Sequence, residues 1–275
     1  MESNQSIQAV EIRRKFPPDW EVPEFRIEFW DGKRSDYCVV VPVINEGERV
    51  RQFIHRVKEA NIDAIADVII VDGGSTDGSL DEGYLRLHNV CGLLTKVGPG
   101  KLSAQLRVAY SFAIAAGYDG VVTIDGNNKD DPASIPAFLN ALVSGSDFIQ
   151  ASRYISGGIS VNTPIVRDWG IRFLHAPALS LCSGFRWTDT TQGFRGYSKK
   201  LLESSKLNIF RDIFCGYELL AYLSYAAPRL GYACLELPTK REYPPGEAPT
   251  KISNIRGNFQ VFKVLVKACV GSYDP

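Results

Sequence analysis

The stretch VVVPVINEGERV at 39–50 decides the fold, and VIIVDGGSTDGS at 68–79 repeats its design. Each stretch begins with a continuous apolar run rich in β-branched residues, which is typical of a strand buried on both faces of a parallel sheet. Each then changes to polar residues that start turns or cap helices. Apolar residues follow at positions 50, 53, 54 and 57, the spacing of one helix face, so the first stretch predicts a strand, a turn and a helix in that order.

The same unit recurs through the first half of the chain. Apolar runs at 121–124 and 148–151 predict further buried strands, and residues 103–116 and 131–142 have helical spacing. Alternating strands and helices place the chain in the α/β class, with a mostly parallel central sheet and helices on both faces.

The regular alternation decays beyond about residue 155, which divides the chain into unequal parts. Upstream of the first unit, apolar residues at 25, 27 and 29 alternate with charged ones, so a strand is predicted there, and Asp31-Gly32 supplies a turn that returns the chain into 37–44. We expect an N-terminal extension with an added strand (1–35), a nucleotide-binding half (36–155), a half of the same domain that shapes the second substrate site (156–255) and a C-terminal helix (256–275).

Composition excludes several classes of protein. The 275 residues carry 31 basic and 31 acidic side chains, a balance that argues against a nucleic-acid partner, because phosphate neutralisation needs excess Lys and Arg. The six cysteines and three histidines show no zinc-ligand spacing, so the cysteines are expected to be buried thiols in a reducing compartment. With no signal peptide and no apolar stretch of about 18 residues, we expect a cytoplasmic protein or one that is peripheral on the cytosolic membrane face.

Polar clusters follow three of the predicted strands, at 45–46, 72–77 and 125–127. In an open α/β sheet, ligands bind beyond the carboxyl ends of the strands, so these clusters predict a ligand site. The glycine patterns of dinucleotide-binding folds and of P-loop NTPases are both absent, which disfavours those two classes.

The clusters and their surroundings resemble a known family. VVVPVINEGERV, VIIVDGGSTDGS and TIDGNNKDDP (123–132) are similar to three signatures of family 2 glycosyltransferases, enzymes of the GT-A fold that use nucleotide-diphosphate sugars. DFIQASRY (147–154), DTTQGFRGY (189–197) and CGYELLAY (215–222) extend the resemblance to the dolichol-phosphate mannose synthase branch of polyprenyl-phosphate glycosyltransferases, without its transmembrane part. The resemblance implies an inverting glycosyltransferase with a GDP- or UDP-linked sugar as donor.

The resemblance assigns the donor site residue by residue. Residues expected to bind the nucleotide are Pro42, Asn45, Glu46, Asp72, Gly74, Ser75, Lys101 and Gly126. Asp125 and Asn127 occupy the outer positions of the Asp-x-Asp motif, which holds Mg²⁺ or Mn²⁺ against the diphosphate. The chain departs from the family at Asn127, where a carboxylate is usual, and at Lys129, where glutamine is usual; an ammonium group there could bind phosphate instead.

The resemblance also places the acceptor site. Arg153 and Arg167 match arginines that lie near the phosphate-bearing substrates, and Lys129, Arg195, Arg241 and Lys251 complete the expected phosphate or acceptor contacts. Arg241 and Lys251 belong to RxYPxGExPTK (241–251), which resembles a basic acceptor loop. Asp189 and Glu218 are the candidate bases, because a sugar hydroxyl must lose its proton to a carboxylate, whereas a lipid phosphate is already anionic.

Several alternatives stay open at this point. The acceptor can be polyprenyl phosphate or a saccharide in cell-surface polysaccharide biosynthesis. Residues 255–270 place Phe259, Phe262, Val266 and Val270 on one face of a helix, which suits either peripheral membrane contact or packing on the enzyme's own body. The rival functions are a catalytically silent nucleotide-sugar-binding scaffold, suggested by Asn127 and Lys129, and a sugar nucleotidyltransferase. The sugar, the base and the oligomeric state are not specified.

Overall fold

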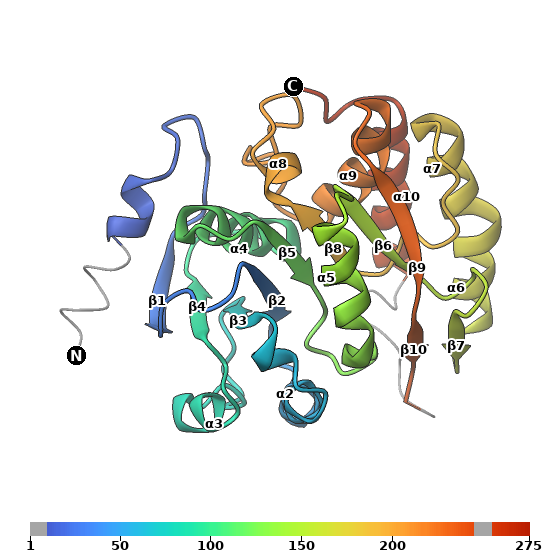
Figure 1. Cartoon of the computed structure of the whole chain (residues 1–275). Helices are drawn as coiled ribbons and strands as arrows, with labels where there is room; N and C mark the ends of the chain where they lie inside the picture. Colours follow the sequence, from blue (N-terminus) through green and yellow to red (C-terminus); the bar gives the residue numbers. More distant parts are fainter. Residues whose placement is uncertain (1–9, 245–254) are drawn as a thin grey trace.

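The computed structural model describes residues 10–244 and 255–275, and it is built on one eight-stranded sheet (Figure 1). The strand order is β1-β4-β3-β2-β5-β8-β6-β9, and β7 and β10 form a second, two-stranded parallel sheet. The strands are β1 (Phe25–Trp30), β2 (Tyr37–Val43), β3 (Asp67–Asp72), β4 (Gly92–Lys96), β5 (Gly120–Thr123), β6 (Phe148–Ser152), β7 (Ile159–Val161), β8 (Arg195–Ser198), β9 (Cys234–Pro238) and β10 (Lys240–Glu242).

Helices cover both faces of the large sheet. They are α2 (Glu48–Glu59), α3 (Glu82–Leu87), α4 (Leu102–Ala116), α5 (Ile135–Val143), α6 (Ile165–Gly170), α7 (Ala176–Ser183), α8 (Lys199–Leu202), α9 (Glu218–Arg229) and α10 (Ile255–Cys269), with short helical turns η1 (Ile62–Ala64) and η2 (Pro132–Ser134) and a π-helical turn η3 (Ile171–His175). Within the described residues, no helix is long and apolar enough to cross a membrane.

Two apolar cores lie on opposite faces of the sheet. One packs the sheet against α2, α3 and α5, and the other packs it against α4, α8 and α9, with α7 and α10 outside them. Successive residues of a strand point to opposite faces, so Val40 enters one core and Val41 the other. The continuous apolar run of β2 is therefore explained by burial of the strand on both faces of the sheet, as predicted.

The predicted mostly parallel sheet is confirmed, with two antiparallel exceptions. β8 runs antiparallel between β5 and β6, and β1 runs antiparallel to β4. The turn predicted at Asp31-Gly32 does not return β1 onto β2, so the expectation of a hairpin there is wrong. Segment 31–36 instead crosses toward Asp67, whose carboxylate accepts hydrogen bonds from the backbone N–H groups of Arg34 and Ser35 at 2.7 and 3.2 Å.

This topology gathers the predicted site at one edge of the sheet. The chain leaves β2, β3, β5 and β6 at their carboxyl ends, and the antiparallel β8 begins at the same edge. Thr123 pairs with Arg195, which brings the loop before β8 beside Asp125. β9 continues into β10, and an isolated antiparallel bridge joins Asp130 to Arg241.

Candidate active site

The loops after β2 and β3 are joined by side-chain hydrogen bonds. The Asn45 side-chain oxygen accepts from the backbone N–H of Thr76 at 2.8 Å, and the backbone N–H of Gly47 donates to Asp77 at 2.8 Å. Asp72 is buried at the end of β3, and its carboxylate accepts from the hydroxyl of Ser75 at 2.6 Å. The two loops thus form one rigid platform beside the sheet edge.

Asp125 lies where the chain leaves β5. A Cβ atom at Gly193 would overlap a carboxylate oxygen of Asp125, so only glycine allows the β8 loop to approach this closely. A side chain at Gly126 would likewise strike Val43 on β2. The amide nitrogen of Asn127 lies 3.4 Å from Asp125 Oδ2, and its oxygen accepts from the backbone N–H of Lys129 at 3.2 Å.

Arg241 links this loop to β10. Its buried guanidinium pairs with the fully buried carboxylate of Asp130 and lies 3.6 Å from Asp125 Oδ2. Burial would lower the pKa of Arg241, but Asp130, Tyr243 and Asp125 together outweigh it and the pKa is raised, so the guanidinium remains charged. Arg241 therefore lies beside the loop that carries Asp125 and Lys129, although about a hundred residues separate them in the chain. All three are residues that the sequence predicted for the site.

Asp189 and Arg153 form a buried ion pair. Arg153 Nε donates to Asp189 Oδ2 at 2.7 Å and Nη2 donates to Oδ1 at 3.1 Å, while the Gln192 amide donates at 2.8 Å. Burial would raise the pKa of Asp189, but Arg153 outweighs burial and lowers it. A carboxylate held in this way is a poor proton acceptor.

Tyr243 lies among the cationic side chains. The Lys129 ammonium is 5.2 Å from the centre of its ring, and the guanidinium groups of Arg241 and Arg167 are 5.6 and 6.0 Å away. Burial would raise the pKa of Tyr243, but Arg241, Arg167 and Arg153 outweigh it and lower the pKa. Burial, followed by the charge of Arg241, lowers the pKa of Lys129. We call Lys129, Arg153, Arg167 and Arg241 the cationic cluster.

Two N–H groups of this cluster are buried without a hydrogen-bond partner among the described residues. They are Nη1 of Arg153 and Nε of Arg167. Buried donors normally have partners, so an unpaired guanidinium N–H beside other cations indicates a site built for an anion.

Other predicted site residues lie apart from the cluster or serve another purpose. Lys101 is exposed where α4 begins, and the Glu218 carboxylate accepts from the backbone N–H of Gly216 at 2.6 Å. Arg195 is fully buried and donates to the carbonyls of Gln192, Thr190 and Leu220 at 3.0, 2.9 and 2.7 Å. This placement does not fit the acceptor contact predicted for Arg195, because its donors already bind the backbone. Lys251 lies outside the described residues.

Sequence reasoning missed three residues beside the site. Tyr243 lies in RxYPxGExPTK (241–251), where only Arg241 and Lys251 were expected to contact substrate. His175 ends the π-helical turn, and its ring nitrogen lies 2.5 Å from the Thr190 hydroxyl. The amide of Gln105 on α4 donates to the last carbonyl groups of β2 and β3, at Val43 and Val71. Only Gln105 had a sequence signal, a polar residue on the buried face of a helix.

Few side chains among the described residues are placed to act as ligands for a divalent cation at this site. Asp125 offers a carboxylate and Asn127 an amide oxygen, which are ligand types that Mg²⁺ and Mn²⁺ accept. Among the described residues, no group of three or more His, Cys, Asp or Glu side chains could hold a metal ion. Asp125 and Asn127 thus fit a cation that takes most of its ligands from the diphosphate and water, and such a cation would compete with Arg241 for Asp125.

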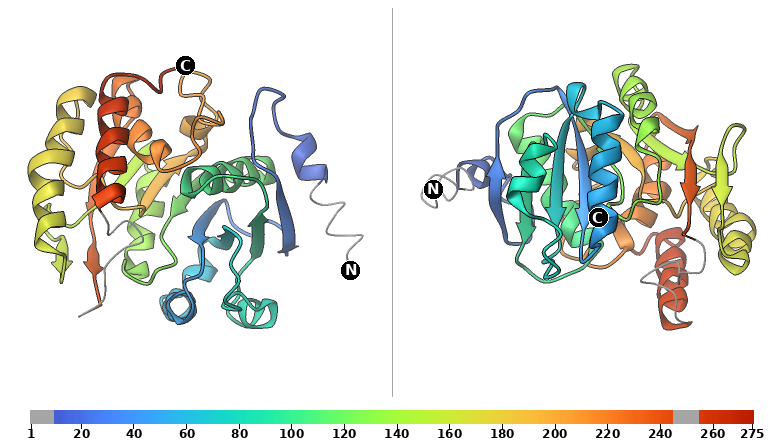
Figure 2. Two further views of the ribbon diagram at one scale, coloured as in Figure 1. Left: turned by 180° about the vertical axis from the view of Figure 1, so that it is seen from behind. Right: turned by 90° about the horizontal axis from the view of Figure 1, so that it is seen from below.

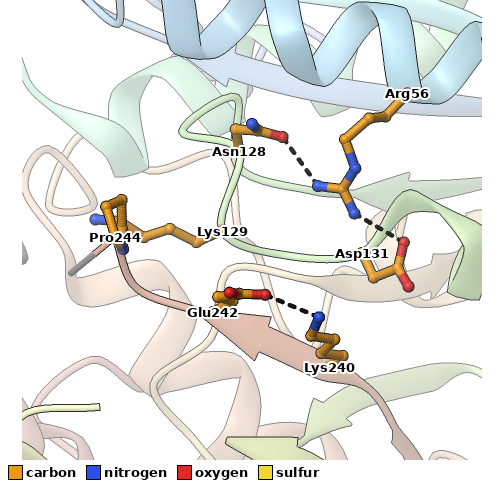
Figure 3. Close-up of a pocket in the computed structure, with 7 residues that line it drawn as sticks. All are labelled: Arg56, Asn128, Lys129, Asp131, Lys240, Glu242 and Pro244. Atoms are coloured by element: carbon orange, nitrogen blue, oxygen red, sulfur yellow. Dashed lines mark hydrogen bonds and ion pairs between the residues drawn. The ribbon is translucent and has the colours of Figure 1, made fainter. Parts of the chain in front are cut away.

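A polar cavity of about 410 Å³ adjoins the other side of the Asp125–Asp131 loop (Figure 3). Arg56 of α2 crosses toward the loop, where it donates to Asn128 at 2.9 Å and to Asp131 at 3.0 Å. Lys240 and Glu242 of β10 pair across the opposite wall at 2.8 Å. The ends of Lys129 and Pro244 close one side, so this cavity and the cationic cluster share Lys129.

Comparison with known proteins identifies the family and several relatives of the chain. The family model described as "Glycosyl transferase family 2" matches residues 38–205. An undecaprenyl-phosphate mannosyltransferase of Micrococcus luteus is 28% identical over 204 residues, 72% of this chain and 80% of the relative. A dolichol-phosphate mannosyltransferase of Pyrococcus furiosus is 27% identical over 175 residues, 62% of this chain but 48% of the relative.

A solved structure shares the fold. Glucosyl-3-phosphoglycerate synthase from Mycobacterium tuberculosis, in complex with Mn²⁺, uridine-diphosphate and glucosyl-3-phosphoglycerate, superposes with a TM-score of 0.54 at 17% identity, over 86% of this chain and 79% of that one. The large, mostly parallel sheet with helices on both faces is the GT-A fold. Since the family model covers more than half of the sequence, the chain belongs to glycosyl transferase family 2.

Proposed function

We propose that this glycosyltransferase moves a sugar, with inversion, from a nucleotide-diphosphate sugar to the phosphate of a polyprenyl phosphate. The observation that carries the proposal is the cationic cluster, whose four basic side chains outnumber the three carboxylates paired with them, Asp189, Asp130 and Asp125. Such a site suits an anionic acceptor. The names of the Micrococcus and Pyrococcus relatives point to the same class of acceptor.

The donor would lie along the platform formed by the loops after β2 and β3. Asp72 and Glu46 would contact the nucleoside, beside the backbone of Gly74, Ser75 and Gly126, and Ser75 donates a hydrogen bond to Asp72. Asp125 and Asn127 would hold Mg²⁺ or Mn²⁺. When bound, that cation would neutralise charge on the departing nucleotide diphosphate.

A phosphate acceptor removes the need for a base. Its anionic oxygen would attack the anomeric carbon while the bond from that carbon to the donor phosphate oxygen breaks, and no proton must leave the acceptor. Arg153 and Arg167 would orient the acceptor phosphate through the N–H groups that lack a partner. We infer that Asp189 fixes Arg153 in place and acts as a positioning residue; Glu218 remains the candidate base for a hydroxyl acceptor.

A donor panel tests the first half of this proposal. Thermal unfolding is followed with UDP, GDP and their sugars, with and without Mn²⁺, because a ligand of the folded state raises its stability by mass action. We expect one nucleotide series to raise the unfolding temperature. Asp125→Ala should weaken that binding about tenfold or more, as expected for loss of a charged contact, while Asp36→Asn, an exposed site, should not. Equal binding by Asp125→Ala would contradict the donor-site assignment.

A further inference from the structure

The column formed by α6, η3 and α7 presents an apolar stripe to solvent. Val166, Trp169, Phe173 and Leu181 recur at helical spacing and are 82%, 61%, 63% and 87% exposed. A helix on a protein surface normally turns its polar side outward. Here the inward side is also apolar, with Ile171 and Leu179 in the core.

α10 extends this surface. It lies beside α7 in Figure 1 and in the left view of Figure 2, seen from behind, and Cys269 contacts Cys182 and Ala178 of α7. Val264, Leu265 and Ala268 of α10 are buried against the body. Phe262, Val266 and Val270 remain exposed. We call the four exposed residues of the α6–α7 column and these three of α10 the outer helical surface.

Basic side chains predominate among the charges around the outer helical surface. Arg172, Arg186, Lys263 and Lys267 are exposed at its margins. Asp168 is the sole acidic residue in segments 165–186 and 255–269 of the sequence. Its carboxylate accepts a hydrogen bond from the Tyr154 hydroxyl at 2.8 Å and forms an ion pair with Arg172 at 3.6 Å. The surface therefore combines exposed aromatic and aliphatic side chains with a basic margin.

One helix connects this surface to the candidate active site. α6 turns Val166 and Trp169 outward, and it carries Arg167, which lies inward near Tyr243 of the cationic cluster. An amphiphile whose phosphate reaches Arg167 would have its hydrocarbon tail on the outer side of the same helix. This link to the reaction rests on the proposed function, whereas the surface itself does not.

We propose that the outer helical surface docks the enzyme on an anionic lipid bilayer, with α6 at the boundary between lipid and active site. Apolar side chains enter the headgroup–acyl boundary, and the basic margin attracts anionic headgroups, the combination by which interfacial helices bind membranes. The predicted membrane contact through residues 255–270 thus supplies only part of the surface, and the α6–α7 column supplies the rest.

Flotation with vesicles tests docking without any donor. The full chain is mixed with phosphatidylcholine vesicles or with vesicles containing about 30% phosphatidylglycerol, at low and high salt. We expect binding to the anionic vesicles to be about tenfold stronger and to weaken with salt. Binding should shift the emission of Trp169 to shorter wavelength, and Trp169→Phe should float equally while losing that shift.

Matched variants separate specific docking from general stickiness. Trp169→Glu combined with Phe173→Glu should lower vesicle binding about tenfold or more. Leu87→Glu combined with Val143→Glu changes residues that are equally exposed, at 76% and 67%, but lie on α3 and α5, and should have no effect. Circular dichroism checks that each variant is folded.

Three outcomes would overturn the proposal: no flotation of the parent chain, equal loss in both double variants, or a dimer that shields Trp169 and does not bind vesicles. Donor binding in vesicle-free buffer is measured on the same variants. If the parent chain does not dock but still binds the donor, only the docking surface is rejected. If the parent chain docks but binds no donor, only the proposed function is rejected.

Discussion

The lack of a side chain at Gly193 leaves space for the Asp125 carboxylate in its observed position. We expect Gly193→Ala to displace Asp125, because the added Cβ atom would overlap a carboxylate oxygen. A displacement of about 1 Å can lower a rate about 100-fold, so kcat/KM should fall by about tenfold to 100-fold. The measurement is sugar transfer under saturating acceptor.

The control for this prediction is Gly170→Ala. A Cβ atom there has open space, and the right-handed helical backbone of Gly170 (φ −59°, ψ −37°) is one that alanine adopts. Transfer by Gly170→Ala should equal that of the parent chain. If Gly193→Ala kept full activity, the close approach of the β8 loop to Asp125 would not matter for donor binding.

We predict that the free energy of unfolding decreases in mild acid because of His175. Burial, followed by the charge of Arg195, lowers its pKa to about 4, below the ordinary value of 6.5. Between these two pKa values, the His175 ring is protonated in the unfolded chain and neutral in the folded chain. The free energy of unfolding that His175 contributes is therefore complete above pH 6.5 and is lost as the pH falls toward 4. The loss is about 1–3 kcal/mol.

Urea unfolding between pH 7.5 and 4.5 measures this effect. His175→Gln should flatten the decline, since glutamine can still bond to Thr190 but does not titrate. His55→Gln removes an exposed ring that pairs with Glu59 and lies 6.2 Å from the His88 ring, and it should leave the slope unchanged. A slope that is the same in His175→Gln and in the parent chain would show that His175 does not control acid stability.

At this scale, the sequence allowed prediction of residues that follow directly from a strand end. Asp72 and Asp125 belong to this group, because a parallel sheet places such residues at one edge whatever the packing around them. The environment of Arg195 could not be predicted, since an arginine that donates to three carbonyls has the same sequence context as one that binds a phosphate. Tyr243 approaches Lys129 only because β10 bridges to the Asp130 loop, a contact between distant parts of the chain.

At the scale of elements, local patterns identified strands and helices but not all their neighbours. β2, β3, β5 and β6 and α2, α4 and α5 follow from apolar runs and helical spacing. The pairing of β1 with β4 and the insertion of β8 between β5 and β6 depend on contacts between distant segments, which periodicity does not encode. The apolar face of residues 255–270 was seen, but its division into a buried and an exposed side required the packing of α10 on α7 and α9.

The contact between α7 and α10 is testable by cross-linking. Cys182 Sγ and Cys269 Sγ lie 2.6 Å apart as free thiols. Oxidised glutathione should join them, with the two thiols losing two protons and two electrons and two molecules of reduced glutathione released. The resulting bridge should stabilise the chain by about 2–4 kcal/mol, the usual range for a disulfide.

Peptide mapping by mass spectrometry identifies the bridge. Cys182→Ser should abolish it, and Cys215→Ser, which removes an exposed cysteine elsewhere, should not. Failure to form the bridge in the folded parent chain, with thiols that react freely with iodoacetamide, would contradict the docking of α10 against α7.

At the scale of the whole molecule, a neutral chain separates its charges by position. Carboxylates follow the strands of residues 36–155, whereas the cationic cluster combines side chains from this segment and from residues 156–255 at the sheet edge. A second set of basic side chains borders the outer helical surface. The donor, the anionic acceptor and the lipid surface would thus each meet a region of suitable chemistry.

The most direct test of this account is transfer from the donor found in the panel to vesicles that contain either polyprenyl phosphate or the matching polyprenol. We predict that organic extraction recovers a lipid-linked sugar only with the phosphate, in amounts equal to the nucleotide diphosphate released. Arg167→Gln should reduce that product about tenfold or more, as expected when a guanidinium–phosphate contact is lost. Equal transfer to polyprenol, or nucleotide release without any lipid-linked sugar, would contradict the account.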